Sequence, residues 1–538
     1  MIMLKAKIPR FLRRFSSKKR DQHQNQKATN SAPNSQSPSP TPAATIPPEP
    51  QPSTSSPNEN RLAGQPNSGS TMERMEYTDV EQKAKKNERV EAVGDAMETD
   101  EPNRQIQWRF SQLKGAMDQA VASDADQITT VQFSEDGELL TTGDRGGRIV
   151  IFKRSESYQP NGRRSAEYAV YSTFQSHEPE FDYLKSLEIE EKINQIKWMK
   201  KKSSSDFLLS TNDKTIKLWK ISERRKQLSD GNFNISRDNG RLKRVNDDLL
   251  LPQLEDMELV VEATPRRVYS NAHTYHINSI SLNADQDTFI SADDLRINLW
   301  HHEITKESFT IVDIKPANME ELVEVITSAE FHPQSDFMFA YGSSKGLVRL
   351  CDTRQKALCD EAAKVFEAKD EMHGFFSEIV SSVSDVKFSN NGRYLLTRDY
   401  LSAYVWDLKM DSAPIETYSI HDYLRNKLCT LYENDAIFDK FESCWSGDDT
   451  HILSGSYNNY FRTFDRGTGQ DTVAEANYRL YRQENGSLQR GQLCGQPRTE
   501  VDLESLDFDA KIMHSAWHPK ENIVALAAGN LLYVFEAD

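Results

Sequence analysis

The adjacent pair Asp293 and Asp294 is the first feature of the sequence that could do chemistry. Two neighbouring carboxyl groups can share the work of a general acid and a general base. The pair lies in a tight turn, however, and an aspartate in such a turn commonly hydrogen-bonds its own backbone. Because capping the turn needs only one acid, we expect the other to face solvent, where it could form a salt bridge with a basic peptide. A structural role and a binding role both remain open.

Two further runs carry chemical groups but are better explained by structure. His301 and His302, followed by Glu303, could ligate a metal, yet they come directly after a strand aromatic and are interpreted as a solvated strand end. Residues 143–148 are glycine-rich, but neither Gly-Lys-Ser/Thr nor a helical pattern follows, so they are interpreted as a hairpin turn. Without a GxSxG elbow, an HExxH run, a P-loop or cysteines and histidines at metal-binding spacing, the sequence predicts no enzyme, no cofactor and no metal site.

The elements that must position the Asp pair belong to a unit that recurs along the chain. In residues 210–219 a turn at Asn212 and Asp213 is followed by a strand that alternates apolar and polar residues and ends in Trp219. Six further copies end in the following residues: Phe152, Trp300, Cys351, Trp406, Phe464 and Phe535. The copies are about 50 to 80 residues apart, against about 40 to 45 for an unadorned propeller blade. We therefore expect seven repeats with insertions.

Small sheets of this kind cannot bury both faces alone, and radial stacking into a closed ring solves that problem. The last copy has residues 532–535 as its third strand and no fourth strand after it. Residues 106–110 could supply the missing strand from the other end of the fold, which would leave no free sheet edge. The sequence thus predicts an all-β fold for residues 104–538, a seven-bladed WD40 β-propeller closed by an N-terminal strand.

Composition and charge restrict the class of partner. The 538 residues carry a net charge of −16, which disfavours nucleic acid and anionic membranes and favours basic peptide segments. Five cysteines, an odd number without a CxxC spacing, argue against a disulfide framework and a structural zinc site. No apolar run approaches the ~18 residues that span a bilayer, so no integral membrane association is expected. We expect a cytoplasmic protein, with a nuclear location left open.

Residues 1–103 differ in composition from the repeat region. The first twenty hold eight Lys and Arg residues and no acid, which leaves organelle targeting or a membrane-surface helix open. Pro9 interrupts the helical spacing there, and a disordered basic tip is favoured. Residues 21–103 are rich in Gln, Ser, Pro, Asn and Thr and almost free of aromatics, so we expect a disordered N-terminal tail. Within the repeat region, the polar segment 467–504 is expected to be a mobile insertion.

Strand direction sorts the connecting segments onto two faces. In an antiparallel blade the turn between the second and third strands shares a face with the connection into the next blade, and the third-to-fourth turn lies opposite. Arg145 and Asp294 are second-to-third turn residues and Leu322 lies in a connection between blades, so they share one face. The polar insertion 223–256 follows a third strand and is expected to project from the other face as a β-hairpin arm. A face that carries many charged turns and connecting segments, together with an arm on the opposite face, is typical of an adaptor protein.

Six segments carry a resemblance to a known family: 174–192, 207–222, 271–278, 291–300, 311–322 and 398–401. They resemble the B-family WD40 regulatory subunits of protein phosphatase 2A, and the resemblance is dense from residue 106 to residue 538. It implies a non-catalytic subunit of a heterotrimer, with a helical-repeat scaffold subunit and a metal-dependent Ser/Thr phosphatase catalytic subunit as partners. It also implies that the chain selects phosphoprotein substrates with basic segments and so sets the selectivity and location of the phosphatase.

The resemblance further implies two binding surfaces. In that family the arm grips the scaffold, and the arm here is the insertion 223–256, although its sequence departs from that of the family. Scaffold contacts are expected around Arg224, Arg225, Arg241, Lys243, Arg244, Leu250 and Pro252. The opposite face recruits substrates through an acidic groove, in which Asp294 supplies the acid for a basic residue and Leu322 supplies an apolar contact. Further groove and rim positions are matched by Asp124, Arg145, Lys185, Glu188, Tyr275, His276, Phe375, Phe376, Tyr432, Asp435, Phe438 and Lys440. Asp124 and Arg145 stand where the family has Glu and Lys, so the charge is kept while the reach differs.

Two other functions remain open from the residues alone. A stand-alone WD40 scaffold, such as a substrate receptor of a ubiquitin ligase, would not bind the phosphatase scaffold, and loss of the arm would then be harmless. A propeller hydrolase would need a cluster of histidines or carboxylates on the innermost strands, and the sequence alone does not assemble one.

Overall fold

A computed structural model of the chain describes residues 106–117, 122–158, 164–183, 186–228, 235–238, 241–244, 254–356, 358–359, 361–368, 374–483, 487–494 and 506–537. The expected disordered tail, residues 1–103, lies outside these ranges.

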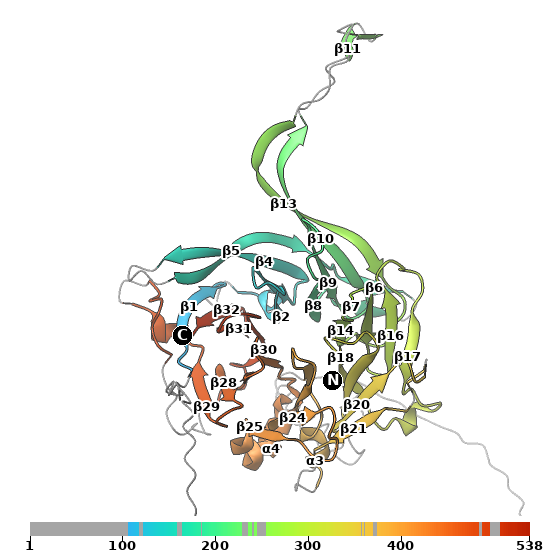
Figure 1. Cartoon of the computed structure of the whole chain (residues 1–538), viewed down its shortest axis with the longest axis vertical. Helices are drawn as coiled ribbons and strands as arrows, with labels where there is room; N and C mark the ends of the chain where they lie inside the picture. The colour runs from blue at the N-terminus through green and yellow to red at the C-terminus, as the bar shows by residue number, and fades with distance from the viewer. Residues whose placement is uncertain are drawn as a thin grey trace, which may run out of the picture. The chain divides into compact units, whose positions relative to one another are not determined.

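The described residues form seven four-stranded antiparallel sheets, the blades, which follow one another around a ring (Figure 1). Blades one and two consist of β2 (Ile128–Phe133), β3 (Leu139–Asp144), β4 (Arg148–Tyr158), β5 (Arg164–Gln175), β8 (Gln195–Trp198), β9 (Asp206–Thr211), β10 (Ile216–Leu228) and β13 (Leu254–Tyr269). Blades three and four consist of β14 (Ser279–Leu282), β15 (Thr288–Ala292), β16 (Arg296–His301), β17 (Phe309–Asp313), β18 (Ile326–Phe331), β19 (Met338–Ser343), β20 (Leu347–Asp352) and β21 (Lys364–Glu367). Blades five to seven consist of β22 (Asp385–Phe388), β23 (Tyr394–Arg398), β24 (Ser402–Asp407), β25 (Glu416–Ser419), β26 (Ser443–Trp445), β27 (His451–Gly455), β28 (Tyr460–Asp465), β29 (Asp471–Glu475), β30 (Ile512–Trp517), β31 (Ile523–Ala528), β32 (Leu531–Glu536) and β1 (Arg109–Lys114). The predicted seven-bladed β-propeller is confirmed.

The hydrophobic core lies between neighbouring blades rather than at the centre of the ring. Ile149 and Ile151 of blade one, for example, share a buried cluster with Trp219 of blade two. The first strand of each blade lies innermost and neighbours the first strands of the two adjacent blades (Figure 1). Apolar side chains on both faces of each blade therefore close the ring, as stacked small sheets require.

A series of side-chain hydrogen bonds explains why the recurring unit combines an acid in the turn with an aromatic residue at the end of the strand. In blade three the Trp300 indole N–H donates to Ser291 Oγ at 2.8 Å, and His273 Nε2 lies 2.6 Å from the same oxygen. His273 Nδ1 lies 2.9 Å from Asp293 Oδ2, which completes the chain from the strand to the turn. All four side chains are buried, so the polar groups that shape the turn satisfy one another.

The ring is closed by β1, which pairs antiparallel with β32 from Arg109 opposite Glu536 to Lys114 opposite Leu532. The predicted closure is confirmed, although the strand begins three residues later than the predicted segment 106–110. Trp108, just before β1, is 2 % exposed and donates its indole N–H to Thr463 Oγ1 of blade six at 2.9 Å. The N-terminal strand is thus bonded to both of the last two blades.

In the segment 467–504, which was expected to be a mobile insertion, the structure describes residues 467–483 and 487–494. It contains β29, the fourth strand of blade six, and a 3-10 helix, η5 (Tyr478–Tyr481). Tyr481 is 1 % exposed and stacks on Phe110 with ring centroids 4.5 Å apart. The backbone N–H of Phe110 also donates to the Gln492 carbonyl at 2.8 Å. Described residues of this segment thus pack against a strand from the other end of the fold, and residues 484–486 and 495–504 lie outside the described ranges.

The expected arm is the continuation of blade two. β10 and β13 stay paired beyond the blade, as far as Leu228 opposite Leu254, and project from the ring (Figure 1). Two short strands, β11 (Ile235–Asp238) and β12 (Arg241–Arg244), pair with each other in the same insertion. A second, smaller hairpin of β6 (Glu180–Asp182) and β7 (Leu187–Ile189) lies in the connection between blades one and two. No helix in the described ranges is long and apolar enough to cross a membrane.

Candidate functional site

The upper face is defined here by the turns between second and third strands together with the connections that enter each blade. At blade one it carries η1 (Asp124–Asp126) and the β3–β4 turn. The backbone N–H of Arg145 donates to the Gln127 carbonyl at 2.9 Å, which fastens the turn to the segment that follows η1. Asp124 and Arg145 are both exposed, so the structure brings these two predicted residues to one part of the rim.

The two acids of blade three have different surroundings. Asp293 is fully buried, and its Oδ1 accepts the backbone N–H groups of Leu295 at 2.8 Å and Arg296 at 2.7 Å. Burial raises its pKa, but the contact with His273 and these amide bonds outweigh burial and leave the pKa below its usual value. Asp294 is only half-buried. One acid therefore shapes the turn, and the other is available on the upper face.

Asp294 is under the electrostatic influence of Lys440, which comes from another blade. Lys440 lies in the connection that enters blade six. Burial raises the pKa of Asp294 and lowers that of Lys440, and the charge of each residue opposes the shift of the other. These two predicted groove residues are therefore within electrostatic range of each other, although they come from blades that are not adjacent.

Tyr275 and His276 precede blade three, and Tyr275 lies near the short helix next to Leu322, the predicted apolar contact. His276 Nδ1 is 2.7 Å from Asp213 Oδ2 in the β9–β10 turn. This hydrogen bond raises the pKa of His276, and Asp294 adds to the effect. The Tyr275 hydroxyl lies 4.0 Å from the sulfur of Met319 in η2 (Met319–Glu321), the 3-10 helix that ends at Leu322.

Four predicted aromatics form one cluster. Phe375 and Phe376 precede α3 (Ser377–Val380), and Tyr432 lies in α4 (Leu428–Glu433). The Tyr432 ring centroid is 5.6 Å from that of Phe375, 6.1 Å from that of Phe376 and 5.9 Å from that of Phe438 in η4 (Ala436–Phe438). Asp435, at a positive φ of 61°, starts η4. The cluster joins the connections that enter blades five and six.

The remaining predicted residues are placed only in part. Glu188 lies in β7 opposite Phe181, whereas Lys185 lies outside the described residues. In the arm, Arg224 and Arg225 are exposed on β10. The backbone of β12 holds Arg241, Lys243 and Arg244, and Leu250 and Pro252 lie outside the described residues.

Charged residues in the central channel were missed from the sequence. Lys387 Nζ lies 3.0 Å from Asp385 and 3.9 Å from Glu330, and Lys197 Nζ also lies 3.9 Å from Glu330. A cluster of innermost carboxylates thus exists, contrary to the expectation that none could be assembled. Lysines neutralise it, and no group of three or more metal-ligating side chains occurs within the described ranges. The usable signal was that Lys197, Glu330 and Lys387 each precede the aromatic of a first strand.

The sequence was expected to hold no Gly-x-Ser-x-Gly elbow, yet the spacing itself is present. Residues 342–346 match Gly-x-Ser-x-Gly, which in hydrolases marks a nucleophile on a strand-to-helix turn. Here they end β19 and form the hairpin turn to β20. Ser344 is 5 % exposed, and its Oγ accepts the backbone N–H of Val325 at 3.1 Å. The match is a turn, as the strand pairing on both sides requires.

Two comparisons with known proteins identify the family. The model of the WD domain, G-beta repeat, matches residues 120–153 and 264–301, which include the inner strands of blades one and three. The chain is 60 % identical over 458 residues to the serine/threonine-protein phosphatase 2A regulatory subunit sur-6 of Caenorhabditis elegans, an alignment that covers 81 % of this chain and 92 % of that relative. The chain therefore belongs to the B family of regulatory subunits of protein phosphatase 2A and is a regulatory rather than a catalytic chain.

Proposed function

We propose that this chain is the substrate-selecting subunit of a phosphatase heterotrimer. It binds a helical-repeat scaffold subunit through its lower face and arm, and it recruits Ser/Thr-phosphorylated proteins with basic segments through an acidic groove on the upper face. The observation that carries the proposal is the position of Asp294, a half-buried acid on the face opposite the arm. A recruiting site and an assembly site on opposite faces can be occupied at the same time.

The proposed mechanism is proximity. A groove that holds a phosphoprotein near the active site of another chain raises the local substrate concentration there. Asp294 would pair with a basic side chain of the substrate, and Leu322 and Tyr275 would contact its apolar part. The aromatic cluster would extend this contact, because its rings belong to connections on the same face.

The root of the arm supports the scaffold assignment. Leu259 and Val260 of β13 are 48 % and 45 % exposed, and Val170 of β5 is 64 % exposed. Apolar side chains this exposed often mark an interaction surface. Arg224 and Arg225, with 62 % and 72 % of their side chains exposed, flank them and form ion pairs with Glu262 and Glu223.

Co-migration on a sizing column tests the class of function. Purified chain, phosphatase scaffold and phosphatase catalytic subunit are expected to elute as one three-component peak. Three separate peaks would contradict the proposal and favour a stand-alone WD40 scaffold for another complex. For location we propose the cytoplasm, with the nucleus as a second site, which fractionation of cells that express the tagged full chain would test.

A further inference from the structure

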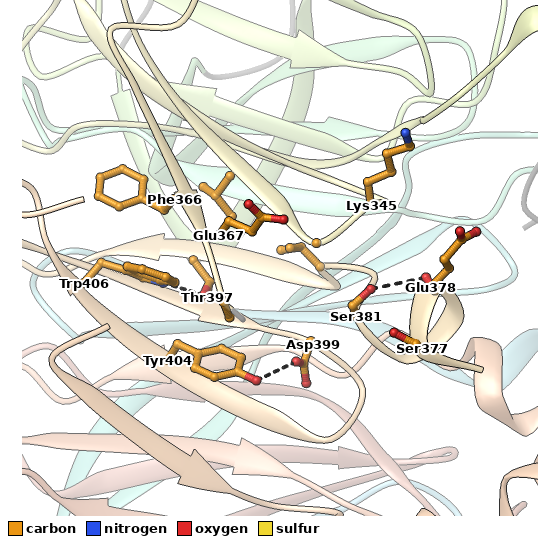
Figure 2. A pocket seen from close by; sticks show the side chains of 14 residues that line it. Lys345, Phe366, Glu367, Ser377, Glu378, Ser381, Thr397, Asp399, Tyr404 and Trp406 are labelled. Atoms are coloured by element: carbon orange, nitrogen blue, oxygen red, sulfur yellow. Dashed lines mark hydrogen bonds between the residues drawn. The ribbon is translucent and has the colours of Figure 1, made fainter. Parts of the chain in front are cut away.

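A pocket of about 320 Å³ opens on the upper face between blades four and five (Figure 2). It is bounded by the β19–β20 turn at Lys345, the β23–β24 turn at Asp399 and the segment that contains α3. Its floor is the buried core between the two blades, where Val383 and Trp406 pack together. None of the predicted groove residues lines it. The pocket is thus a separate cavity, at the small end of the size range of ligand sites.

The charged lining of the pocket is mainly acidic. Glu367, Glu378 and Asp399 reach it from three different segments, and Lys345 is the one cation among its lining residues. Figure 2 shows Glu367 and Asp399 on different sides of the cavity. Glu367 and Glu378 are exposed and have no hydrogen bond or ion pair from their carboxylates within the described part of the chain. Two carboxylates at the rim are therefore open to a cation from outside.

Lys345 alone cannot balance the three carboxylates of the pocket lining. Burial alone would raise the pKa of Glu324, but Arg349 and, more weakly, Lys345 hold it below its usual value. Lys345 therefore acts on Glu324, which does not line the pocket. In Figure 2 its amine also points away from Asp399. The local field in the pocket remains negative.

Asp399 is the carboxylate deepest in the pocket wall. Its Oδ1 accepts the backbone N–H groups of Leu401 at 2.8 Å and Ser402 at 2.6 Å, and its Oδ2 accepts the Tyr404 hydroxyl at 3.0 Å. Burial nevertheless raises the pKa of Asp399 to about 6, because these bonds and the charge of Arg398 only partly replace the lost hydration. A cation in the pocket would favour the ionised form.

We propose that this pocket receives one lysine or arginine side chain of a docked protein segment. The methylene stem would lie along Ala368 and Val383, and the charged end would lie among the three carboxylates. The inference rests on the proposed recruitment of basic segments and adds a second anchoring point to it. The aromatic cluster lies next to the pocket along the chain, which supports this proposal: Phe376 of the cluster is followed directly by Ser377 of the pocket lining. A segment that crosses the cluster can reach both sites.

Saturation-transfer NMR on the purified full chain tests the pocket directly. The probe is N-acetyl-arginine-N-methylamide, and its uncharged citrulline analogue is the comparison. Saturation is expected to pass to the arginine probe and not to the citrulline analogue. Glu367→Gln and Asp399→Asn are each expected to weaken binding of the arginine probe about fivefold, the factor that corresponds to ~1 kcal/mol. Glu307→Gln, at an exposed acid between β16 and β17 that belongs to neither the pocket nor the groove, is the matched control and is expected to leave probe binding unchanged. Asp294→Asn measures how much of the transfer comes from the groove, where the arginine probe can also bind.

Three outcomes would overturn the inference: no transfer to the arginine probe, equal transfer to both probes, or loss of transfer in Asp294→Asn but not in the pocket variants. Glu367 is exposed, so Glu367→Gln remains informative if Asp399→Asn disturbs the turn; thermal unfolding of each variant separates the two cases. The assay needs neither the scaffold nor the catalytic subunit. A negative NMR result would therefore not contradict heterotrimer assembly. In the same way, failure of the chain to co-migrate with the phosphatase subunits would not contradict binding of the probe to the pocket.

Discussion

Asp293 and Asp294 are adjacent and chemically identical, yet the turn gives them different surroundings. Asp293 completes the chain from Trp300 through Ser291 and His273, and it also holds two backbone N–H groups. Asp294 has the charge of Lys440 before it instead. The sequence pattern was enough to predict that one acid would cap the turn and the other would be left over. It could not say which lysine would face the second acid, because Lys440 comes from a distant blade.

The first prediction reverses the charge of Asp294. Asp294→Lys is expected to abolish recruitment of phosphoproteins with basic segments, since two positive charges would then meet in the groove. Binding to the scaffold and catalytic subunits is expected to be unchanged in a pull-down assay. Asp293→Ala is the contrasting variant: it leaves two backbone N–H groups and a histidine without their acceptor and should lower the free energy of unfolding by about 1–3 kcal/mol. Loss of assembly in Asp294→Lys would contradict the assignment of two separate faces.

The second prediction concerns the His276–Asp213 pair. The hydrogen bond raises the pKa of His276 above 6.5, and the same bond, against burial, helps to hold the pKa of Asp213 below 3.8. Both partners are charged between these two pKa values, and the pair stabilises the fold there. The contribution is lost as pH rises through the raised pKa of His276, and at the acid end as Asp213 becomes protonated.

His276 is 57 % exposed, so solvent screening should keep this contribution below ~1 kcal/mol. The measurement is the difference in free energy of unfolding between the wild type and His276→Gln. It is expected to be larger at about pH 6 than at about pH 9. An equal difference at both values would mean that the ion pair does not form in solution.

Among the elements, β1 shows how far sequence reasoning can reach. A strand missing from the last repeat is a local observation, and the alternation in residues 106–110 offered a replacement. The order of η5 and the residues after it could not be predicted in the same way, because it comes from packing against Phe110. The pocket between blades four and five was also beyond reach, since its wall combines three segments that only the ring brings together.

The third prediction removes the anchor of β1. Trp108 is 2 % exposed and contacts the rings of Phe461 and Trp517 at centroid distances of 6.3 Å and 5.2 Å. Trp108→Ala should therefore lower the free energy of unfolding by about 3–5 kcal/mol, as large-to-small changes in a core do. Met117→Ala, at a residue that is 45 % exposed just after β1, is the control and should be nearly neutral. Equal stability of both variants in chemical denaturation would show that closure does not depend on this anchor.

The fourth prediction shortens the arm. Because Leu228 is paired with Leu254, residues 229–253 can be replaced by Asn-Gly, which suits a two-residue hairpin turn. The shortened chain is expected to bind the scaffold more weakly while its melting temperature stays unchanged, since no blade loses a strand. Titration of labelled scaffold measures the affinity. Unchanged affinity would refute the role of the arm tip, and the variant with both Arg224 and Arg225 changed to Glu would then test its root.

For the whole molecule, the two faces should respond differently to salt. Recruitment of a basic segment by an acidic groove depends on long-range attraction, which is screened over ~10 Å at 0.1 M ionic strength. The fifth prediction is that a rise from about 0.05 M to 0.3 M salt weakens substrate binding to the assembled heterotrimer by about tenfold or more. Assembly itself, which we propose buries apolar surface at the arm root, should change less. Anisotropy of a labelled substrate measures substrate binding, and sedimentation measures assembly of the heterotrimer. If salt weakened both equally, the proposed division of roles between the two faces would be contradicted.

The pairing of β1 with β32 also determines when the ring can close during synthesis of the chain. The strand at residues 109–114 leaves the ribosome long before its partner at residues 531–536 is made. Blades one to six can form as they emerge, while β1 waits with its edge uncovered for a partner more than four hundred residues downstream. A protein whose translation stopped before residue 531 would be an open ring in which β1 has no partner strand. Chaperones and proteases can distinguish that form from the finished subunit.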